Sequence, residues 1–432
     1  MTHHNLSFTK LRPFLILWAT QSLSSLGSAM TSFALVIWSY EQQGSALSTA
    51  LLSVCSYAPY VIMSIFSGAL SDRWNKKYTM LLCDTFAACS TLAVLLLLCT
   101  DSLAVWHLYL LNALNGLMNT VQSPASDVAV TLLTPREQIQ RVSALQSLSG
   151  SLVTVLTPAI AAVLLTFGGM FLVIILDLLS FAAAFTALLL FIKIPAGQEH
   201  AAVREPLTAS VRGGLQYLKD NRGILDLILF LAAINLIASM YNAALPAMLL
   251  SRQNGGETVL GLVSTVTGLA TLAGSIIVSF TDAPKNRSRV ICNTLLFSMS
   301  TENLLLAVGR TPLIWCVGAV LGWLFIPVMN TNMNALLRSY IPVEMQGRVY
   351  SARNSLQFFT IPVGYLLSGF LIDNVLEPFM AVQTSDSFFC ALLGTGKGTG
   401  AALLFLLLSV SGILVCICFR FDRYIKNLES NK

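Results

Sequence analysis

Gly68-Ala-Leu-Ser-Asp-Arg-Trp-Asn-Lys-Lys77 is a short charged turn between two long apolar segments. The apolar segments, residues 47–66 and 78–98, each approach the ~20 residues that a helix needs to cross a bilayer. Arg73, Lys76 and Lys77 place three cations in the turn, and such cations favour the cytoplasmic side of a membrane. The turn therefore predicts two membrane-spanning helices that are joined on the cytoplasmic side.

The composition of the whole chain is typical of a polytopic membrane protein. Of its 432 residues, 55% are hydrophobic and 10% are charged, whereas soluble domains have about 25% charged residues. The four His residues form no metal-ligand spacing, and of the nine Cys only Cys390 lies in a predicted loop. We therefore expect no metal site, no disulfide framework and no cofactor.

The apolar segments predict an all-α membrane protein with twelve transmembrane helices. Backbone groups in lipid must be hydrogen-bonded within their own segment, so runs of this length form helices. The expected spans are residues 13–40, 48–70, 78–99, 105–127, 142–167, 170–192, 224–250, 259–280, 290–308, 313–337, 349–372 and 401–421.

The distribution of Lys and Arg predicts the orientation of these spans. With the amino terminus in the cytoplasm, only Arg252, Arg310 and Lys397 of the 25 Lys and Arg residues lie outside. Positive charge concentrates on cytoplasmic loops, so both termini are predicted to be cytoplasmic. The net charge of +5 is explained by this distribution and does not indicate binding to nucleic acid.

A repeat and a linker divide the chain into two halves. The pattern Pro-x-Glu-x-x-x-Arg-Val follows the fourth predicted helix, at Pro135, and the tenth, at Pro342. We expect a six-helix bundle over residues 1–192, a cytoplasmic linker over 193–223 and a second six-helix bundle over 224–432. The spacing of Leu207, Val211, Leu215 and Leu218 predicts a short amphipathic helix in the linker. The long outer loop, residues 373–400, ends in the Gly-rich run Gly394–Gly400. This run lacks the GxxxxGK[ST] spacing of a phosphate-binding loop and is predicted to be a flexible linker.

The charged turn resembles the signature loop between helices 2 and 3 of the major facilitator superfamily. Asn75 stands where that superfamily usually has Gly, and Asn tolerates a left-handed backbone. A tandem pair of six-helix halves is also the design of these transporters. Topogenic charge alone would explain the cations of the turn but not its Asp-Arg pair. The residues that carry the resemblance are Gly68, Leu70, Asp72, Arg73, Lys76 and Lys77.

Nearly the whole chain resembles the macrolide-efflux type of major facilitator exporter, a group that also includes siderophore exporters. Further residues that carry this resemblance are Trp18, Gln21, residues 24–28, Gly44-Ser45-Ala46, Pro59, Asp84, residues 135–142 and Glu377-Pro378.

This resemblance implies a function and a location. We expect a monomeric secondary active exporter in the bacterial inner membrane, in contact with membrane lipids, that moves hydrophobic or amphiphilic small molecules by alternating access driven by protons. An exporter dedicated to a siderophore or another secondary metabolite is the alternative, and a lysophospholipid transporter is a third option. A membrane enzyme would need a cluster of catalytic side chains, and the spacing of His, Cys and carboxylates shows none.

Four stripes of polar residues predict a substrate cavity. Polar groups inside apolar helices are costly and usually face a cavity or a partner helix. In the resembled superfamily, helices 1, 4, 7 and 10 line a central cavity, and the stripes fall on those helices. Interhelical hydrogen bonds, worth ~0.6 kcal/mol each, are the simpler explanation for any one residue. The stripes are Gln21, Ser25 and Ser28 in the first predicted helix, and Asn112, Asn115, Asn119 and Gln122 in the fourth. The other two are Asn235, Ser239 and Asn242 in the seventh, and Asn330 and Asn334 in the tenth.

Two carboxyl groups embedded in predicted spans are candidates for proton coupling. They are Asp177 in the sixth span and Glu302 in the ninth. A proton-coupled carrier needs a carboxyl that alternates between exposed and buried states. Many antiporters of the resembled superfamily carry Arg near the position of Asn112, so coupling is implied by the resemblance and not by this residue.

The resemblance also implies a cytoplasmic gate. Asp72 is expected to meet the amino end of the eleventh helix, where Arg348 lies, and Arg73 is expected to pair with Asp127. Surface ion pairs worth ~0–1 kcal/mol are the alternative reading of the same residues. The repeated motifs contribute Glu137, Arg141 and Glu344 to this gate.

Overall fold

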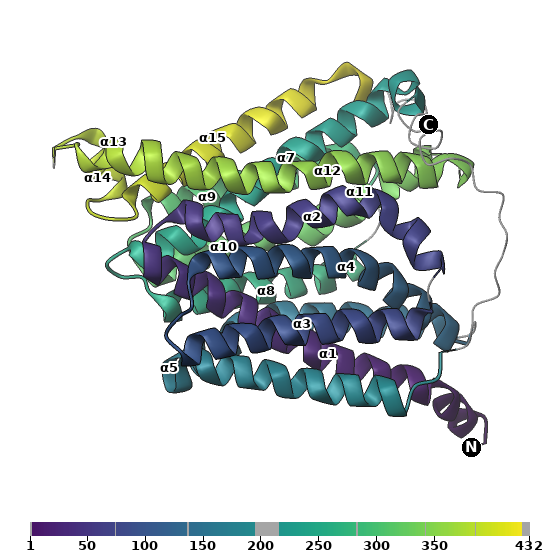
Figure 1. Cartoon of the computed structure of the whole chain (residues 1–432). Coiled ribbons are helices and arrows are strands. Elements are labelled where there is room, and N and C mark those ends of the chain that lie inside the picture. Colours follow the sequence, from purple (N-terminus) through teal and green to yellow (C-terminus); the bar gives the residue numbers. More distant parts are fainter. Residues whose placement is uncertain are drawn as a thin grey trace. The chain divides into compact units, whose positions relative to one another are not determined.

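The structure is a computed structural model of the chain, and it is all-helical over the residues that it describes (Figure 1). Its backbone is described for residues 2–73, 75–135, 138–194, 216–281, 284–341, 343–384 and 386–425. Side chains are described for the same residues except 2–10, 64–73, 124, 139–141, 143–144, 338–339, 343–348 and 350–356. Most of the predicted linker helix therefore lies outside the described residues.

The chain forms two compact units. One consists of Met1–Ser39 and Cys55–His200, and the other of Tyr40–Val54 and Ala201–Lys432. The segment that ends the first helix and begins the second thus groups with the carboxyl-terminal unit. The predicted domain boundaries at 192 and 223 stay a prediction.

Among the described residues, five helices lie wholly or mostly in the first unit. They are α1 (Thr2–Gln43), α2 (Ala46–Arg73), α3 (Lys76–Cys99), α4 (Val105–Leu133) and α5 (Ile139–Leu190). Helix α3 packs against both α4 and α5, and Asn75 begins it by accepting the amides of Lys77 and Tyr78. The long α5 contains the fifth and sixth predicted spans, because Gly169 turns the chain with a φ of 62°.

The second unit contains the remaining helices. Helix α7 packs against α12 and α15, and α9 packs against α10, α11 and α15. Figure 1 shows α7, α12 and α15 side by side. The helices are α7 (Arg222–Ser251), α8 (Glu257–Ser279), α9 (Arg287–Val308), α10 (Pro312–Trp323), α11 (Ile326–Tyr340), α12 (Val343–Leu371), the π-helix η2 (Ile372–Leu376), α13 (Glu377–Ala381), α14 (Phe388–Leu393) and α15 (Thr399–Phe421).

The helices confirm the predicted all-α membrane fold. Among the described residues, ten segments are long and apolar enough to cross a membrane. One of these, Leu145–Leu190, contains two predicted spans, and α4 is a further helix of 29 residues. The arrangement is therefore consistent with twelve spans. Large exposed apolar side chains, such as Phe167 at 84% and Phe280 at 87%, suit a lipid environment.

The tenth predicted span is confirmed as one apolar segment, Pro312–Leu337, and a two-residue break divides it into two helices. Helix α10 ends at Trp323 and α11 begins at Ile326. Pro327 explains the break, since proline lacks the amide hydrogen and clashes with the carbonyl of the residue four positions earlier. At the break, the Leu324 carbonyl lies so close to α8 that a Cβ on Gly274 would be 2.0 Å from its oxygen.

The Gly-rich run lacks helix from Gly394 to Gly398, and its flexibility stays a prediction, whereas the outer loop before it, residues 373–393, is largely folded. The folded part contains most of η2 together with α13 and α14, and the Gly398 amide donates to Glu377 Oε1 at 2.9 Å. Ser387 caps α14 by accepting the Cys390 amide. Cys390 is thus a buried helical residue and not part of an open loop. Short apolar pieces such as residues 388–393 are too short to be distinguished from a loop by periodicity.

Candidate functional site

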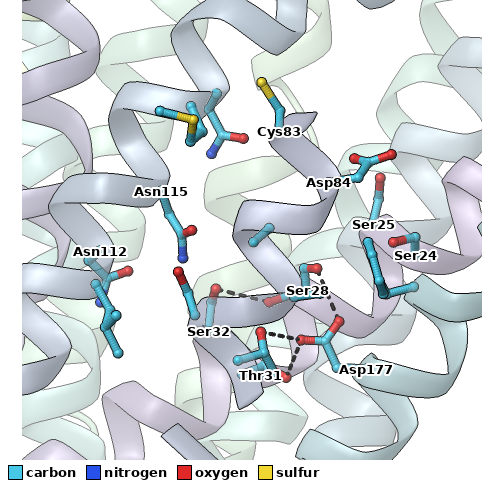
Figure 2. Close-up of a pocket in the computed structure, with 18 of the residues that line it drawn as sticks. Ser24, Ser25, Ser28, Thr31, Ser32, Cys83, Asp84, Asn112, Asn115 and Asp177 are labelled. Atoms are coloured by element: carbon cyan, nitrogen blue, oxygen red, sulfur yellow. Dashed lines mark hydrogen bonds between the residues drawn. The ribbon is translucent and has the colours of Figure 1, made fainter. Parts of the chain in front are cut away.

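A polar cavity of about 240 Å³ lies within the first unit. Its walls come from α1, α3, α4 and α5, with Ser56 contributed by α2. In Figure 2, serines of α1 lie on one side of the cavity and Asn112 and Asn115 of α4 on the other. The lining includes all seven residues that the sequence predicted for α1 and α4, namely Gln21, Ser25, Ser28, Asn112, Asn115, Asn119 and Gln122. Their role as substrate contacts stays a prediction.

Asp177 lies at the wall of this cavity in a cage of hydroxyl groups. It is 3% exposed and accepts hydrogen bonds from Ser28 Oγ at 3.1 Å and Thr31 Oγ1 at 2.9 Å. A third hydroxyl, Thr91 Oγ1 of α3, donates at 3.4 Å. Figure 2 shows the bonds from Ser28 and Thr31. Asp177 thus connects α1, α3 and the second half of α5 through one side chain.

Asp84 of α3 is a second carboxylate in the same cavity. It is 8% exposed and accepts Gln21 Nε2 at 3.1 Å and a hydrogen bond from Gln122 Nε2. Sequence reasoning placed Asp84 near a helix end and did not assign it to the cavity. The available signal was its spacing from Thr91, because residues seven positions apart share one face of a helix.

Two glycines allow the helices around the cavity to approach closely. A Cβ on Gly27 of α1 would lie 2.4 Å from Ser180 Oγ and 2.9 Å from Asp177 Oδ1. A Cβ on Gly116 of α4 would lie 2.1 Å from the Ser56 carbonyl oxygen of α2. Both distances are too short for any real Cβ atom. The cavity walls therefore require glycine at these two positions.

The electrostatic character of the cavity is negative. Its lining contains two Asp residues, and no Lys, Arg or His side chain lies among its lining residues. Every hydrogen bond that the structure gives to the two carboxylates comes from a neutral amide or hydroxyl group. A carboxylate without a cation in an apolar surrounding is costly unless it binds a proton or a cationic group. The arrangement can therefore bind protons or positively charged groups.

The polar residues predicted in the second half are more dispersed. Asn242, Asn330 and Asn334 are exposed and Asn235 is half-buried. Ser239 is buried and packs closely against Gly364 of α12. A Cβ added to Gly364 would lie only 2.7 Å from the Ser239 Cβ. Ser239 therefore occupies a helix contact between α7 and α12. As substrate contacts, all five stay predictions.

Glu302, the other carboxyl predicted for proton coupling, is 5% exposed in the second unit. Its Oε1 accepts the indole Nε1 of Trp323 at 2.8 Å, and Trp323 is the last residue of α10 before the break. Gly322 makes room for it, since a Cβ there would be 2.0 Å from Glu302 Oε2. Glu302 is thus packed between α9 and α10, and its part in coupling stays a prediction.

Most of the predicted gate cannot be placed in the structure. Asp127 is exposed at the surface of α4. The side chains of Asp72, Arg73, Glu137, Arg141, Glu344 and Arg348 lie outside the described residues. The gate therefore stays a prediction from the sequence.

A family model described as transmembrane secretion effector matches residues 6–393. The chain belongs to this major facilitator family. It is therefore a multi-pass membrane transporter of small molecules and not an enzyme.

Curated relatives of this transporter are similar over most of their length. Macrolide efflux protein A of Streptococcus pyogenes is 23% identical over 366 residues, which cover 84% of this chain and 90% of that protein. Multidrug efflux pump Tap of Mycolicibacterium fortuitum is 21% identical over 84% of this chain and 90% of its own length. Enterobactin exporter EntS of Citrobacter koseri is 22% identical over 80% of this chain and 82% of its own length.

Solved structures of major facilitator proteins share the fold. A bacterial homologue of the iron transporter ferroportin has a TM-score of 0.65 at 18% identity, covering 94% of this chain and 99% of its own. The nucleoside transporter NupG has a TM-score of 0.65 at 12% identity, covering 94% of this chain and 100% of its own. Identities this low support the fold and carry no information about the substrate.

Proposed function

We propose that this transporter exports hydrophobic or amphiphilic small molecules from the cytoplasm by alternating access, in exchange for protons. The observation that carries the proposal is the cavity in which Asp84 and Asp177 are buried among neutral donors. The relatives named as macrolide and multidrug efflux proteins support export as the direction. The bacterial relatives support a position in the bacterial inner membrane, and the charge distribution supports cytoplasmic termini.

The chemistry of the cavity suits the polar part of an amphiphilic molecule. Drug-sized ligands occupy pockets of about 300–1,000 Å³, so a cavity of about 240 Å³ holds a head group better than a whole drug. Asn115 is one of the residues that line this cavity, and its Oδ1 atom is buried and accepts no hydrogen bond from the described residues. An unsatisfied buried acceptor costs ~1–3 kcal/mol, so a substrate donor would gain by bonding to it.

Proton coupling follows from the two carboxylates. Each is surrounded by donors that stabilise its ionised form, yet each lies inside an apolar helix bundle where charge is costly. Opening of the cavity to water favours the ionised form, and closure favours the protonated form. Asp177 is the better placed of the two predicted coupling residues, because it borders the cavity whereas Glu302 is packed against Trp323.

An exporter dedicated to one siderophore or other secondary metabolite is the second candidate. The relative named enterobactin exporter, which matches 80% of this chain, favours it. The amide and hydroxyl groups of the cavity suit a molecule rich in hydrogen-bonding groups equally well. A lysophospholipid substrate is a further candidate, and a monomer is the proposed state in all three cases.

A substrate-panel efflux assay in a pump-deficient host tests the proposal. The panel contains macrolides, lipophilic dyes, catecholate siderophores and a lysophospholipid, and the host expresses either the native chain or Asp177→Asn. Gly150→Ala is the matched control, because a Cβ at Gly150, on the same helix, meets nothing within 4 Å. We expect efflux of drugs or dyes with the native chain and the control, and loss with Asp177→Asn. Efflux of siderophores alone would favour the dedicated exporter, and no efflux of any compound would contradict the proposal.

A further inference from the structure

A groove of about 340 Å³ lies on the second unit, between α7 and α15. The two helices pack against each other, and Figure 1 shows them side by side. The floor of the groove is the stacked pair Phe230 and Phe419, whose ring centroids are 3.9 Å apart. Leu229 and Leu414, each about half exposed, form apolar walls. The buried floor and the exposed walls make the groove an open apolar surface on a packed base.

The mouth of this groove carries two carboxylates. Asp226 comes from the second turn of α7, and Asp422 follows the last residue of α15. Asp422 Oδ1 accepts the amides of Tyr424 and Ile425 at 2.8 and 3.1 Å. Asp226 has no hydrogen-bond partner among the described residues. The two carboxylates are close enough to repel each other, and Arg222 attracts Asp226. The mouth thus combines two neighbouring negative charges with one positive charge.

The polar and apolar parts of the groove are ordered along the direction that crosses the membrane. An α-helix rises 1.5 Å per residue, so Leu414 lies ~12 Å further along α15 from its carboxyl end than Asp422. The distribution of Lys and Arg places this end of α7 and of α15 at the cytoplasmic surface. A molecule that fills the groove therefore has its charged part at the level of the lipid head groups and its apolar part among the acyl chains.

We propose that this groove binds one molecule of phosphatidylethanolamine from the cytoplasmic leaflet, with its ammonium group at Asp226 and Asp422 and its phosphate near Arg222. Charge complementarity favours this lipid, because a primary ammonium offers three hydrogen-bond donors to the carboxylates and the phosphate accepts from the guanidinium. Phosphatidylglycerol has the phosphate without the cation, and phosphatidylcholine has a cation without N–H donors. The inference goes beyond the proposed export, and it rests on the predicted cytoplasmic position of these helix ends.

A native cysteine reports whether the groove is occupied. Cys418 lines the groove and is exposed, and Cys89 of α3 is an exposed reference in the first unit. The native chain is reconstituted in liposomes of phosphatidylglycerol, alone or mixed with phosphatidylethanolamine or phosphatidylcholine, and treated with N-ethylmaleimide. Peptide mass spectrometry gives the reaction rate at each cysteine.

We expect phosphatidylethanolamine to lower the Cys418 rate about fivefold relative to the Cys89 rate, because only the unoccupied fraction reacts. Phosphatidylcholine should leave the ratio of the two rates unchanged. Equal ratios in the three membranes, or equal protection by phosphatidylcholine, would overturn the proposal.

Two substitutions remove the negative charges and keep the hydrogen bonds. In Asp226→Asn/Asp422→Asn, the amide oxygen at position 422 can still accept the Tyr424 and Ile425 amides. Phosphatidylethanolamine should no longer protect Cys418 in this double variant. Asp220→Asn is the matched control, because Asp220 is exposed just before α7 and does not line the groove. Equal protection in the control and the double variant would overturn the proposal.

Native mass spectrometry gives a measurement that is independent of cysteine chemistry. The delipidated chain is titrated with phosphatidylethanolamine, and the bound molecules are counted. We expect one molecule to bind the native chain and Asp220→Asn about tenfold more tightly than the double variant, which lacks the bonds to charged oxygens. Equal binding by all three proteins would overturn the site. If the double variant does not fold, Asp226→Asn alone is compared, since it loses no hydrogen bond within the described residues.

Two other occupants would give different results. If the groove binds a cationic substrate, the lipophilic cation tetraphenylphosphonium should protect Cys418 where phosphatidylethanolamine does not. If residues 426–432 of the chain cover the groove, their removal should raise the Cys418 rate equally in all three membranes. Either result would overturn the lipid site. None of these measurements requires transport, so a failure of the proposed export would leave their outcome unchanged.

Discussion

Gly27→Ala should destabilise the first unit and disrupt the hydroxyl cage of Asp177. The added Cβ would lie 2.4 Å from Ser180 Oγ and 3.0 Å from the Asp177 Cα atom, whereas ordinary contacts begin near 3.4 Å. Rotation of Ser180 can relieve the first contact but not the second, which involves the backbone of α5. Helix α1 must therefore move away from α5, and the neighbouring Ser28 and Thr31 would lose their bonds to Asp177.

The expected loss of stability follows from these contacts. Overpacking of a tight contact typically costs ~1–3 kcal/mol, and each of the two interhelical hydrogen bonds adds ~0.6 kcal/mol. Gly27→Ala should therefore lose ~2–4 kcal/mol of unfolding free energy. Gly150→Ala, on the open face of α5, should be neutral or gain up to ~1 kcal/mol from its helix propensity.

A thiol-reactive dye measures this effect in the purified protein, because unfolding exposes the buried Cys83, Cys292 and Cys416. We expect the melting curve of Gly27→Ala to shift to lower temperature and transport to fall, while Gly150→Ala follows the native chain. The double variant Gly27→Ala/Ser180→Ala removes the nearest clashing atom and should recover part of the loss. A Gly27→Ala protein as stable and active as the native one would refute the close approach of α1 and α5.

Three further predictions concern other parts of the chain. Glu302→Gln should fold normally, because the new amide oxygen can still accept a hydrogen bond from Trp323 Nε1. The variant should nevertheless reduce gradient-driven efflux. An unchanged pH dependence of transport would show that Glu302 takes no part in coupling. Gly322→Ala should destabilise the second unit by ~1–3 kcal/mol in a melting assay, because its Cβ would overlap the Glu302 carboxyl group, and a stable variant would contradict that packing. Asp72→Asn should lower transport strongly without lowering the amount of folded protein. It should also increase the labelling of cysteines introduced into the cavity by a reagent on the cytoplasmic side. Normal transport by this variant would exclude the cytoplasmic gate.

Local patterns in the sequence were sufficient to predict most of the fold. Apolar runs of about 20 residues predict helices, because lipid offers the backbone N–H and C=O groups no hydrogen-bond partner outside their own segment. Gly168 and Gly169 lie between the fifth and sixth predicted spans, where the structure bends α5. The break at Leu324 and Phe325 was not predicted, although Pro327 was visible, because proline within an apolar run can kink a helix as well as end it.

The cavity was predicted only in part. Helical spacing brings the polar residues of α1 to one face, and the same holds for α4, so both stripes could be recognised in the sequence. Asp84 was missed because its spacing from Thr91 gives only a shared helix face, and its tertiary partners, Gln21 and Gln122, are what place that face at the cavity. The groove between α7 and α15 was missed for the same reason, since its two carboxylates, Asp226 and Asp422, come from opposite ends of the second half.

The central claim is that Asp177 carries protons in exchange for substrate. Purified protein in liposomes should transport a substrate from the panel faster when a pH gradient is imposed. Asp177→Asn should lose this stimulation while it retains substrate exchange without a gradient, because the cavity and its neutral donors remain. The claim would be contradicted if the pH gradient stimulated transport equally in three proteins: the native chain, Asp177→Asn and the double variant Asp84→Asn/Asp177→Asn.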